Sequence, residues 1–305
     1  MYYFQVTSLK LGENKVVKLL EEDILTKEVL TWKGIHLFHF ALSSCSQKTR
    51  IVLNLKNLSW ESHPVNLYKK EHFTPRYLGI NPRGLVPTLV DDGSVYIESN
   101  DIIQLIDSKS SESILIPEGM ENKVAELLNF EDDLHLDLRT ITFRFTQNRG
   151  KAPRSPSDLK NYRDGGSGMV KGIKDKNKER EITFWETVAE TGITNEAVRT
   201  SAKKFKEALD VIDENLANSK YILSEKISLL DVAWFIYVNR LNLCGYPIES
   251  LHPNVFKWFK SLASQSEFSN EIKIPTEVKQ SIDHHHEFLS QERSTLIDIA
   301  EILQK

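Results

Sequence analysis

Short apolar runs separated by turn residues follow one another through the first third of the chain. Residues 35–40 predict a strand. Ser43 and Ser44 come next and are N-cap residues for a helix, whose apolar face holds Ile51, Val52, Leu55 and Leu58. An extended stretch at 62–67 then leads through a polar loop to a short helical piece near Arg76. The predicted order is therefore strand, helix, strand, helix.

A hairpin and a further helix complete this region. Residues 88–90 and 95–97 are apolar runs on either side of Asp92-Gly93, and an Asp-Gly pair in such a place is a strong hairpin signal. Glu98-Ser99 then begins a helix. Parallel strands need a crossover connection and a hairpin supplies an antiparallel pair, so the order β-α-β-α-β-β-α predicts a small mixed sheet covered by helices. We expect a thioredoxin-like α/β domain at residues 34–110.

Helical signals dominate after Pro117. Residues 229–238 are apolar nearly all round, so the helix that they predict must be buried inside its domain. Ser228 and Asp231 have the spacing of a capping box at the start of this helix. Another stretch has apolar residues at every third or fourth position, namely Ala202, Phe205, Leu209, Ile212 and Leu216. Residues 118–275 are therefore expected to form an all-α domain.

Three segments fall outside these patterns. Residues 1–33 predict an amphipathic extension, and residues 276–305 predict a helical tail. An insertion at about 148–198 interrupts the helical domain, and its part 148–180 carries a net charge of +6 in a chain whose net charge is −4. Its glycines, Gly165-Gly166-Ser167-Gly168, lack the Gly-Lys-Ser/Thr ending of a phosphate loop, so a flexible linker or lid is predicted there.

Composition narrows the class of protein. The chain has 305 residues, 40 % hydrophobic and 27 % charged, as in ordinary globular proteins with two domains. A net charge of −4 gives no electrostatic reason to expect nucleic acid as a partner. Cys45 and Cys244 are the only cysteines, so no disulfide framework is predicted and a reducing, cytoplasmic setting fits. We expect no secretory signal, no membrane span and, because His284-His285-His286 would point in three directions on a helix, no metal site.

Motifs in the first domain resemble the glutathione transferase superfamily. Ser43-Ser44-Cys45-Ser46, followed by Lys48 and Arg50, is similar to the Ser-Ser-Cys signature of the zeta class. Glu71-His72 before a proline resembles the glutathione loop of the phi class. Residues 81–87 together with Glu98-Ser99 resemble bacterial members that include the beta-etherases.

The helical half carries the same resemblance. Residues 221–223 followed by 228–233 are similar to the buried capping-box helix of the family. Over residues 34–110 and 200–245 the resemblance therefore implies the architecture of a cytosolic glutathione transferase, with a thioredoxin-like glutathione-binding domain and an all-α domain behind it.

The first strand-to-helix turn is the candidate catalytic centre. A thioredoxin-like redox protein has Cys-x-x-Cys there, whereas this chain has Ser43 and Ser46, so dithiol chemistry is absent. The resemblance implies that the Ser43 hydroxyl donates to the bound thiolate, which the helix N-terminus also stabilises. Cys45 has two interpretations that both stay open, a small buried residue or a reactive thiol that contributes to activity.

Other residues are assigned to glutathione through the resemblance. A cis Val86-Pro87 bond would turn the backbone of Val86 outward toward the cysteinyl part of the tripeptide. Glu98 would accept from the ammonium group, and Ser99, at a helix start, would donate to the neighbouring carboxylate. His72 would hold the glycine carboxylate, with a solvated loop histidine as the alternative.

We therefore expect a glutathione transferase that consumes glutathione as co-substrate in an attack on a small, hydrophobic or aromatic electrophile. Two alternatives remain. One is Cys45-dependent thiol transfer, isomerisation or reductive dehalogenation, and the other is a non-catalytic protein that uses the same fold for binding or regulation. The resemblance also implies a homodimer.

Overall fold

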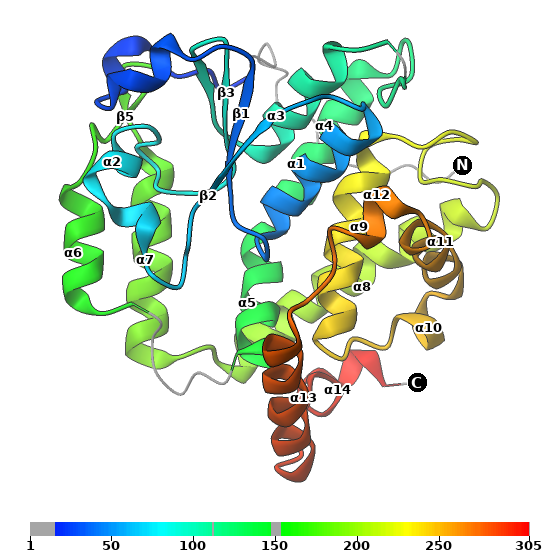
Figure 1. Cartoon of the computed structure of the whole chain (residues 1–305). Helices are drawn as coiled ribbons and strands as arrows, with labels where there is room; N and C mark the ends of the chain where they lie inside the picture. Colours follow the sequence, from blue (N-terminus) through cyan, green and yellow to red (C-terminus); the bar gives the residue numbers. More distant parts are fainter. Residues whose placement is uncertain (1–15, 112, 148–153, 305) are drawn as a thin grey trace. The chain divides into compact units, whose positions relative to one another are not determined.

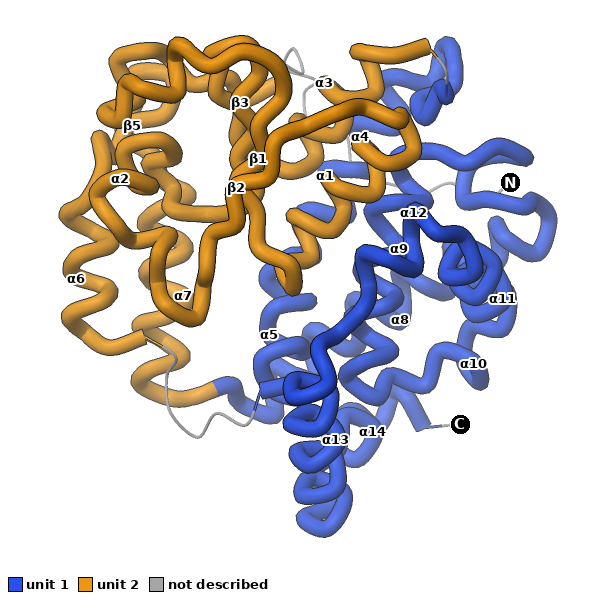
Figure 2. The backbone as a smooth tube through the Cα atoms, in the orientation of Figure 1, with its two compact units in different colours: residues 1–14, 113–149, 193–305 blue, residues 15–112, 150–192 orange. Residues whose placement is uncertain are grey.

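The computed structural model describes residues 16–111, 113–147 and 154–304 (Figure 1). The chain forms two compact units, residues 15–112 with 150–192, and residues 1–14 with 113–149 and 193–305 (Figure 2). Predictions made above for residues 1–15 and 148–153 lie outside the described residues. Each unit has its own core of buried apolar residues.

Within the described residues, the first unit is built on a four-stranded sheet of order β2-β1-β3-β4. The strands are β1 (Ile35–His39), β2 (Glu61–Pro64), β3 (Thr88–Asp91) and β4 (Ser94–Tyr96). β1 is parallel to β2 and antiparallel to β3, and β3 and β4 form the hairpin expected around Asp92-Gly93. The predicted thioredoxin-like order is thus confirmed.

Helices cover both faces of this sheet. α1 (Ser44–Leu55) and α3 (Ser99–Ser108) contact each other on one side, and the short α2 (Pro75–Leu78) lies on the other, next to the 3-10 helix η3 (Glu71–Phe73) (Figure 1). Successive residues of a strand point to opposite faces. Leu37 and Phe38 are both buried, as are Leu89 and Val90. The sheet therefore has a core on each face.

The described part of the N-terminal extension belongs to this sheet. Lys18 forms a bridge with Tyr96, and the Leu19 N–H donates to the Val95 carbonyl at 2.9 Å. The 3-10 helices η1 (Glu21–Asp23) and η2 (Lys27–Thr31) follow, and Leu19, Ile24 and Val29 are buried in the core of the unit. Residues 16–33 thus supply part of the core, which differs from the separate extension expected from the sequence.

The segment 154–192 is also folded into this unit. It contains α6 (Pro156–Asp164), the hairpin β5 (Met169–Val170) and β6 (Ile173–Lys174), and α7 (Lys176–Thr191). Tyr162 and Ile182 from this segment form a buried cluster with Phe73 and Leu78. Within the described residues, the insertion expected at about 148–198 is thus largely a folded part of this unit, because apolar side chains in its two helices are buried against η3 and α2.

The glycines of this segment permit a close approach. Gly166 has φ +70°, and a Cβ on it would lie 2.6 Å from the carbonyl oxygen of Leu78. The hydroxyl of Ser167 donates to the carbonyl of Asp23 at 2.7 Å. Glycine is the residue that adopts such a backbone beside another chain segment without steric cost, so Gly166 serves packing.

The second unit is helical throughout its described residues. Its longest helices are α4 (Glu121–Asp133), α5 (His135–Thr146), α8 (Asn195–Leu216), α9 (Leu229–Leu243), α11 (Pro253–Ala263) and α13 (Thr276–Gln291). The shorter ones are α10 (Ile248–Leu251), α12 (Ser266–Ser269), α14 (Leu296–Ile299) and the 3-10 helix η4 (Glu301–Leu303). α9 contacts α4, α5 and α11, and the expected capping box of Ser228 and Asp231 begins it.

The histidine run lies on α13. Ring nitrogens of His285 and His286 donate to the carbonyls of Arg144 and Phe145 at 3.1 and 2.9 Å, which joins α13 to the end of α5. Over residues 16–111, 113–147 and 154–304, no three His, Cys, Asp or Glu side chains converge in a way that could hold a metal ion. In the same ranges no helix has the length and apolar character needed to cross a bilayer.

Candidate functional site

Strand directions bring the predicted site residues to one edge of the sheet. Ser43 and Cys45 follow β1, and Val86-Pro87 precedes β3, which is antiparallel to β1 with Phe38 opposite Thr88. Glu98-Ser99 follows β4, whose last residue pairs with Leu89 near the start of β3. β2, which is parallel to β1, ends at this same edge before the loop that carries His72. Four chain segments thus converge here although up to 56 positions separate them in the sequence.

Ser43 caps the first helix. Its backbone is extended, with φ −75° and ψ 123°, and its Oγ accepts from the Ser46 N–H at 3.3 Å. A serine hydroxyl that accepts in this way retains its own proton as a donor. The half-buried Ser43 can therefore cap α1 and donate to a bound anion at the same time, and the positive end of the helix dipole lies beside it.

Of the neighbouring side chains, Ser46 has a structural role and Cys45 is a candidate reactive thiol. Ser46 is fully buried, and its Oγ accepts from the Phe40 N–H at 3.3 Å, so it holds the turn. Cys45 is half-buried in the first turn of α1, and within the described residues its thiol forms no disulfide. Burial raises the pKa of the other thiol, that of Cys244, to about 12, which makes Cys244 inert at neutral pH.

The loop before β3 is braced from within. The Val86–Pro87 peptide bond is cis, as the resemblance implied. Tyr77 Oη donates to the Leu85 carbonyl at 2.6 Å, and Asn81 Nδ2 donates to the same carbonyl at 3.0 Å and to Thr88 Oγ1 at 2.9 Å. This network fixes the backbone on both sides of Val86.

Glu98 and Ser99 begin α3 in an unusual conformation. Glu98 has φ 72°, in the left-handed region that residues other than glycine rarely adopt. Its side chain is 34 % exposed and forms an ion pair with Nη1 of Arg83. Ser99 is the first residue of the helix and is 6 % exposed. A carboxylate and a helix start thus lie together, which suits a ligand that carries both an ammonium and a carboxylate group.

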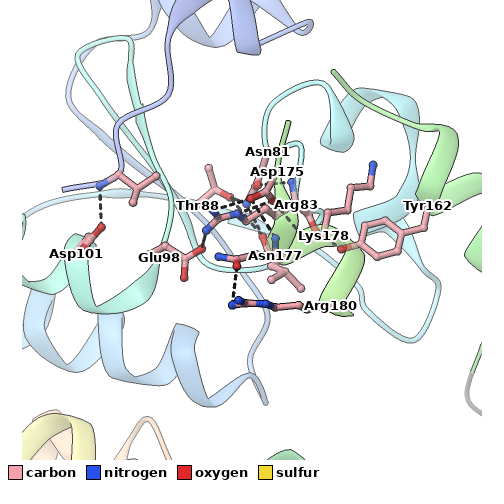
Figure 3. A network of polar contacts seen from close by, with 12 residues as sticks. Asn81, Arg83, Thr88, Glu98, Asp101, Tyr162, Asp175, Asn177, Lys178 and Arg180 are labelled. Carbon is pink, nitrogen blue, oxygen red and sulfur yellow. Dashed lines mark hydrogen bonds and ion pairs between the residues drawn. The ribbon is translucent and has the colours of Figure 1, made fainter. Parts of the chain in front are cut away.

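Arg83 and Asp175 form a pair that the sequence did not indicate. Arg83 donates from Nε to Asp175 Oδ2 at 2.8 Å and from Nη2 to Oδ1 at 2.9 Å (Figure 3). Both residues are buried, and Asp175 comes from the 154–192 segment. The one available signal was that Arg83 falls in an otherwise apolar loop motif, where a buried guanidinium needs an acid.

His72 is less accessible than the resemblance implied. Its side chain is 3 % exposed, and neither ring nitrogen has a hydrogen-bond partner within the described residues. Burial, with the nearby charge of Arg154 as the next cause, lowers the pKa of His72 to about 3, so the ring is neutral at pH 7. Lys69 is exposed, whereas Lys70 pairs with Asp158. The burial of His72 counts against a direct contact with a ligand carboxylate.

Two family models match the chain in order. The model described as "Glutathione S-transferase, N-terminal domain" matches residues 37–113, and the one described as "Glutathione S-transferase, C-terminal domain" matches residues 195–261. Between them lie residues 114–194, which include the segment that carries α6 and α7.

Several curated relatives match part of the chain. A zeta-class glutathione S-transferase of Euphorbia esula is 44 % identical over 89 residues, which are 29 % of this chain and 40 % of the relative. The chain spans about two fifths of the length of the first such relatives. A tetrachloro-p-hydroquinone reductive dehalogenase of Sphingobium chlorophenolicum is 23 % identical over 252 residues, 79 % of this chain and 96 % of the relative.

A solved structure shares the fold. The beta-etherase LigF of Sphingobium sp. strain SYK-6 superposes with a TM-score of 0.63 at 22 % identity, over 78 % of this chain and 98 % of that one. Because it covers this share of the chain, the match includes parts of both units. The two domain matches in the expected order and this shared fold show that the chain belongs to the glutathione transferase superfamily.

Proposed function

We propose that the protein is a glutathione transferase that activates the glutathione thiol through Ser43 for attack on a small, hydrophobic or aromatic electrophile. The observation that carries this proposal is the convergence of Ser43, Val86-Pro87 and Glu98-Ser99 at one edge of the sheet. Each segment suits a different part of one tripeptide. Glutathione is a consumed co-substrate in this reaction.

The geometry of Ser43 supports the role proposed for it. A thiol has an unperturbed pKa of about 8.5. A hydroxyl donor and the N–H groups at the start of α1 stabilise the thiolate over the thiol, so a bound thiol ionises more readily near neutral pH. The thiolate is then the nucleophile, and its fixed orientation toward the electrophile supplies much of the acceleration.

The rest of the tripeptide is assigned to the other segments. The braced backbone at Val86 and Pro87 receives the cysteinyl part as a short strand partner. Glu98 accepts from the ammonium group of the γ-glutamyl end, and Ser99 donates to its carboxylate. His72 stays a proposed contact for the glycine carboxylate, and substitution experiments must decide between it and a packing role.

A second candidate function is supported by one specific observation. Cys45 is a half-buried thiol two residues from Ser43, and the relative matched over most of its length is a reductive dehalogenase. Cys45-dependent dehalogenation, isomerisation or thiol transfer would use the same glutathione site with a protein thiol as the nucleophile. The non-catalytic alternative predicts neither reaction.

Calorimetry with glutathione tests the shared premise. We expect binding heat and a raised melting temperature at millimolar glutathione, since a ligand that binds only the folded state stabilises it. A thiol-consumption screen over aryl halides, aryl ethers, epoxides, disulfides and maleylacetoacetate-like acids then identifies the reaction. Absence of both heat and stabilisation would leave the non-catalytic alternative.

We also propose that the protein is a homodimer, because two-fold dimers are the commonest soluble oligomers and the family resemblance implies one. Light scattering of the full chain at low and high salt tests this. A dimer held by the basic 148–180 segment would dissociate at high salt, since exposed charges are screened there. A monomer under both conditions would refute the dimer.

A further inference from the structure

The buried guanidinium of Arg83 is shared between two carboxylates. Its Nε and Nη2 edge is occupied by both oxygens of Asp175, and Nη1 meets Glu98 (Figure 3). A guanidinium has a planar fork of donors, so the edge that faces one acid fixes what remains for the other. Arg83 therefore contacts Glu98 through Nη1 alone and does not form a bidentate pair with it.

Asp175 is itself held in place by a helix. It is the N-cap of α7, a helix of 16 residues, and its oxygens accept from the N–H groups of Asn177 and Lys178 at 3.3 and 3.2 Å. The side chain is 5 % exposed. Because the cap fixes the carboxylate and the carboxylate fixes Arg83, the start of α7 determines the orientation of the arginine that touches Glu98.

The charges of this cluster favour a cation. Arg83 carries one positive charge, and Glu98 and Asp175 carry one negative charge each. Without the charge of Asp175, the positive charge of Arg83 would neutralise Glu98 only. The guanidinium could then turn its Nε and Nη2 edge toward Glu98. With Asp175 on the Nε and Nη2 edge, the charge of Arg83 is shared between two carboxylates. The partly exposed Glu98 is then less fully neutralised, and an ammonium group is attracted to it.

We propose that Asp175 is a positioning residue for the ammonium end of glutathione. It acts through Arg83 on Glu98, and it comes from the segment that lies between the two matched family domains. This inference rests on the proposed function, because it assigns a further residue to the same glutathione site.

The test compares two ligands on charge-removing variants. Asp175→Asn and Asp175→Ser both keep an N-cap residue for α7, so the helix start is preserved while the charge is lost. The ligands are glutathione and its des-amino analogue, glutaryl-cysteinylglycine, which lacks only the ammonium group. Glu186→Gln is the matched control. Glu186 is an acid on the same helix, and it pairs with Arg163 at 2.8 Å instead of with Arg83.

We expect both Asp175 variants to raise the Kd for glutathione about tenfold and to leave the Kd for the des-amino analogue unchanged. Glu186→Gln should change neither value. Equal weakening of both ligands, or no weakening of either, would overturn the positioning role. If the unmodified protein bound neither ligand, the proposed function itself would fall, and the inference with it.

Discussion

The ring of Tyr162 stacks on the ring of Phe73, with centroids 4.4 Å apart and an angle of 21° between the planes. The hydroxyl of Tyr162 donates to the carbonyl of Arg83. One side chain of α6 therefore contacts both the η3 loop and the loop that leads to β3. Together with the pair of Arg83 and Asp175, this contact makes the 154–192 segment a support for two loops of the proposed glutathione site.

The first prediction concerns Ser43 as the thiolate donor. Ser43→Ala should lower glutathione-dependent turnover about a hundredfold, as loss of a donor to a catalytic anion typically does. The variant also loses the helix cap, which costs about 1 kcal/mol. Steady-state kinetics and a melting curve, measured together, separate the two effects.

The adjacent residues supply the controls for this measurement. Ser44→Ala changes a neighbouring hydroxyl outside the N-cap position and should leave turnover close to normal. Cys45→Ser should reduce turnover less than Ser43→Ala does. If Cys45→Ser were the more damaging change, the Cys45-dependent reaction would be the better account.

The second prediction concerns the packing of the glycine turn on α2. Gly166 and Gly168 have similar backbones, with φ +70° and +67°, but a Cβ on Gly166 would lie 2.6 Å from the Leu78 carbonyl, whereas one on Gly168 would meet no atom within 4 Å. Gly168→Ala should cost about 1 kcal/mol from the backbone alone. Gly166→Ala should cost clearly more. Equal urea midpoints for the two variants would contradict the packing role.

The third prediction concerns pH and His72. The pKa of His72 is about 3 in the folded protein, against an ordinary value of 6.5, because burial disfavours the charged ring. Between pH 6.5 and 3 the unfolded chain binds a proton that the folded protein does not, so stability falls as the pH falls through this window. His72→Leu should therefore lose less stability than the unmodified protein between pH 7 and pH 4.5.

Melting curves across this range check the result. His39 contributes to the same acid sensitivity, because burial and Arg50 lower its pKa to about 4, so the variant should be less sensitive, not insensitive. The exposed His284 gives the control, since His284→Leu removes a histidine that lies in water. Parallel pH profiles for His72→Leu and the unmodified protein would show that the ring is not buried as described.

Local patterns predicted the elements that local interactions determine. The Asp92-Gly93 hairpin and the capping box of Ser228 and Asp231 follow from neighbouring residues, and the structure has both. The pair of Arg83 and Asp175 joins positions 92 residues apart, and no short pattern encodes such a distance.

The burial of the polar 154–192 segment could not be predicted from its composition for a related reason. Its few apolar residues, such as Tyr162 and Ile182, are buried by partners elsewhere in the chain, so composition alone predicted a surface insertion. The same segment buries Phe73 next to His72, which is why a polar loop that looked exposed carries a histidine with 3 % exposure. Burial of a loop residue depends on what covers it, and the covering residues lie far away in the sequence.

The last prediction concerns the start of α9. Asp231 is fully buried and accepts from the N–H groups of Ile222 and Ser228 at 3.0 and 2.8 Å and from Trp258 Nε1 at 3.0 Å. Burial raises the pKa of its carboxyl despite these donors. Asp231→Ala leaves several buried donors without an acceptor, and each such group costs about 1–3 kcal/mol.

We therefore expect Asp231→Ala to destabilise the helical unit by about 3 kcal/mol or more in urea unfolding. Thr295 and Asp298 form the same capping box at the start of α14, but on the surface, with Asp298 accepting from the Thr295 N–H at 3.0 Å. Water can replace that acceptor, so Asp298→Ala should have a much smaller effect. In both boxes the acid accepts from the backbone N–H and the hydroxyl of the cap residue. The difference between the two variants therefore measures the contribution of burial together with the donors of Ile222 and Trp258. Comparable losses of stability would mean that the cap alone, and not its buried network, holds the start of α9.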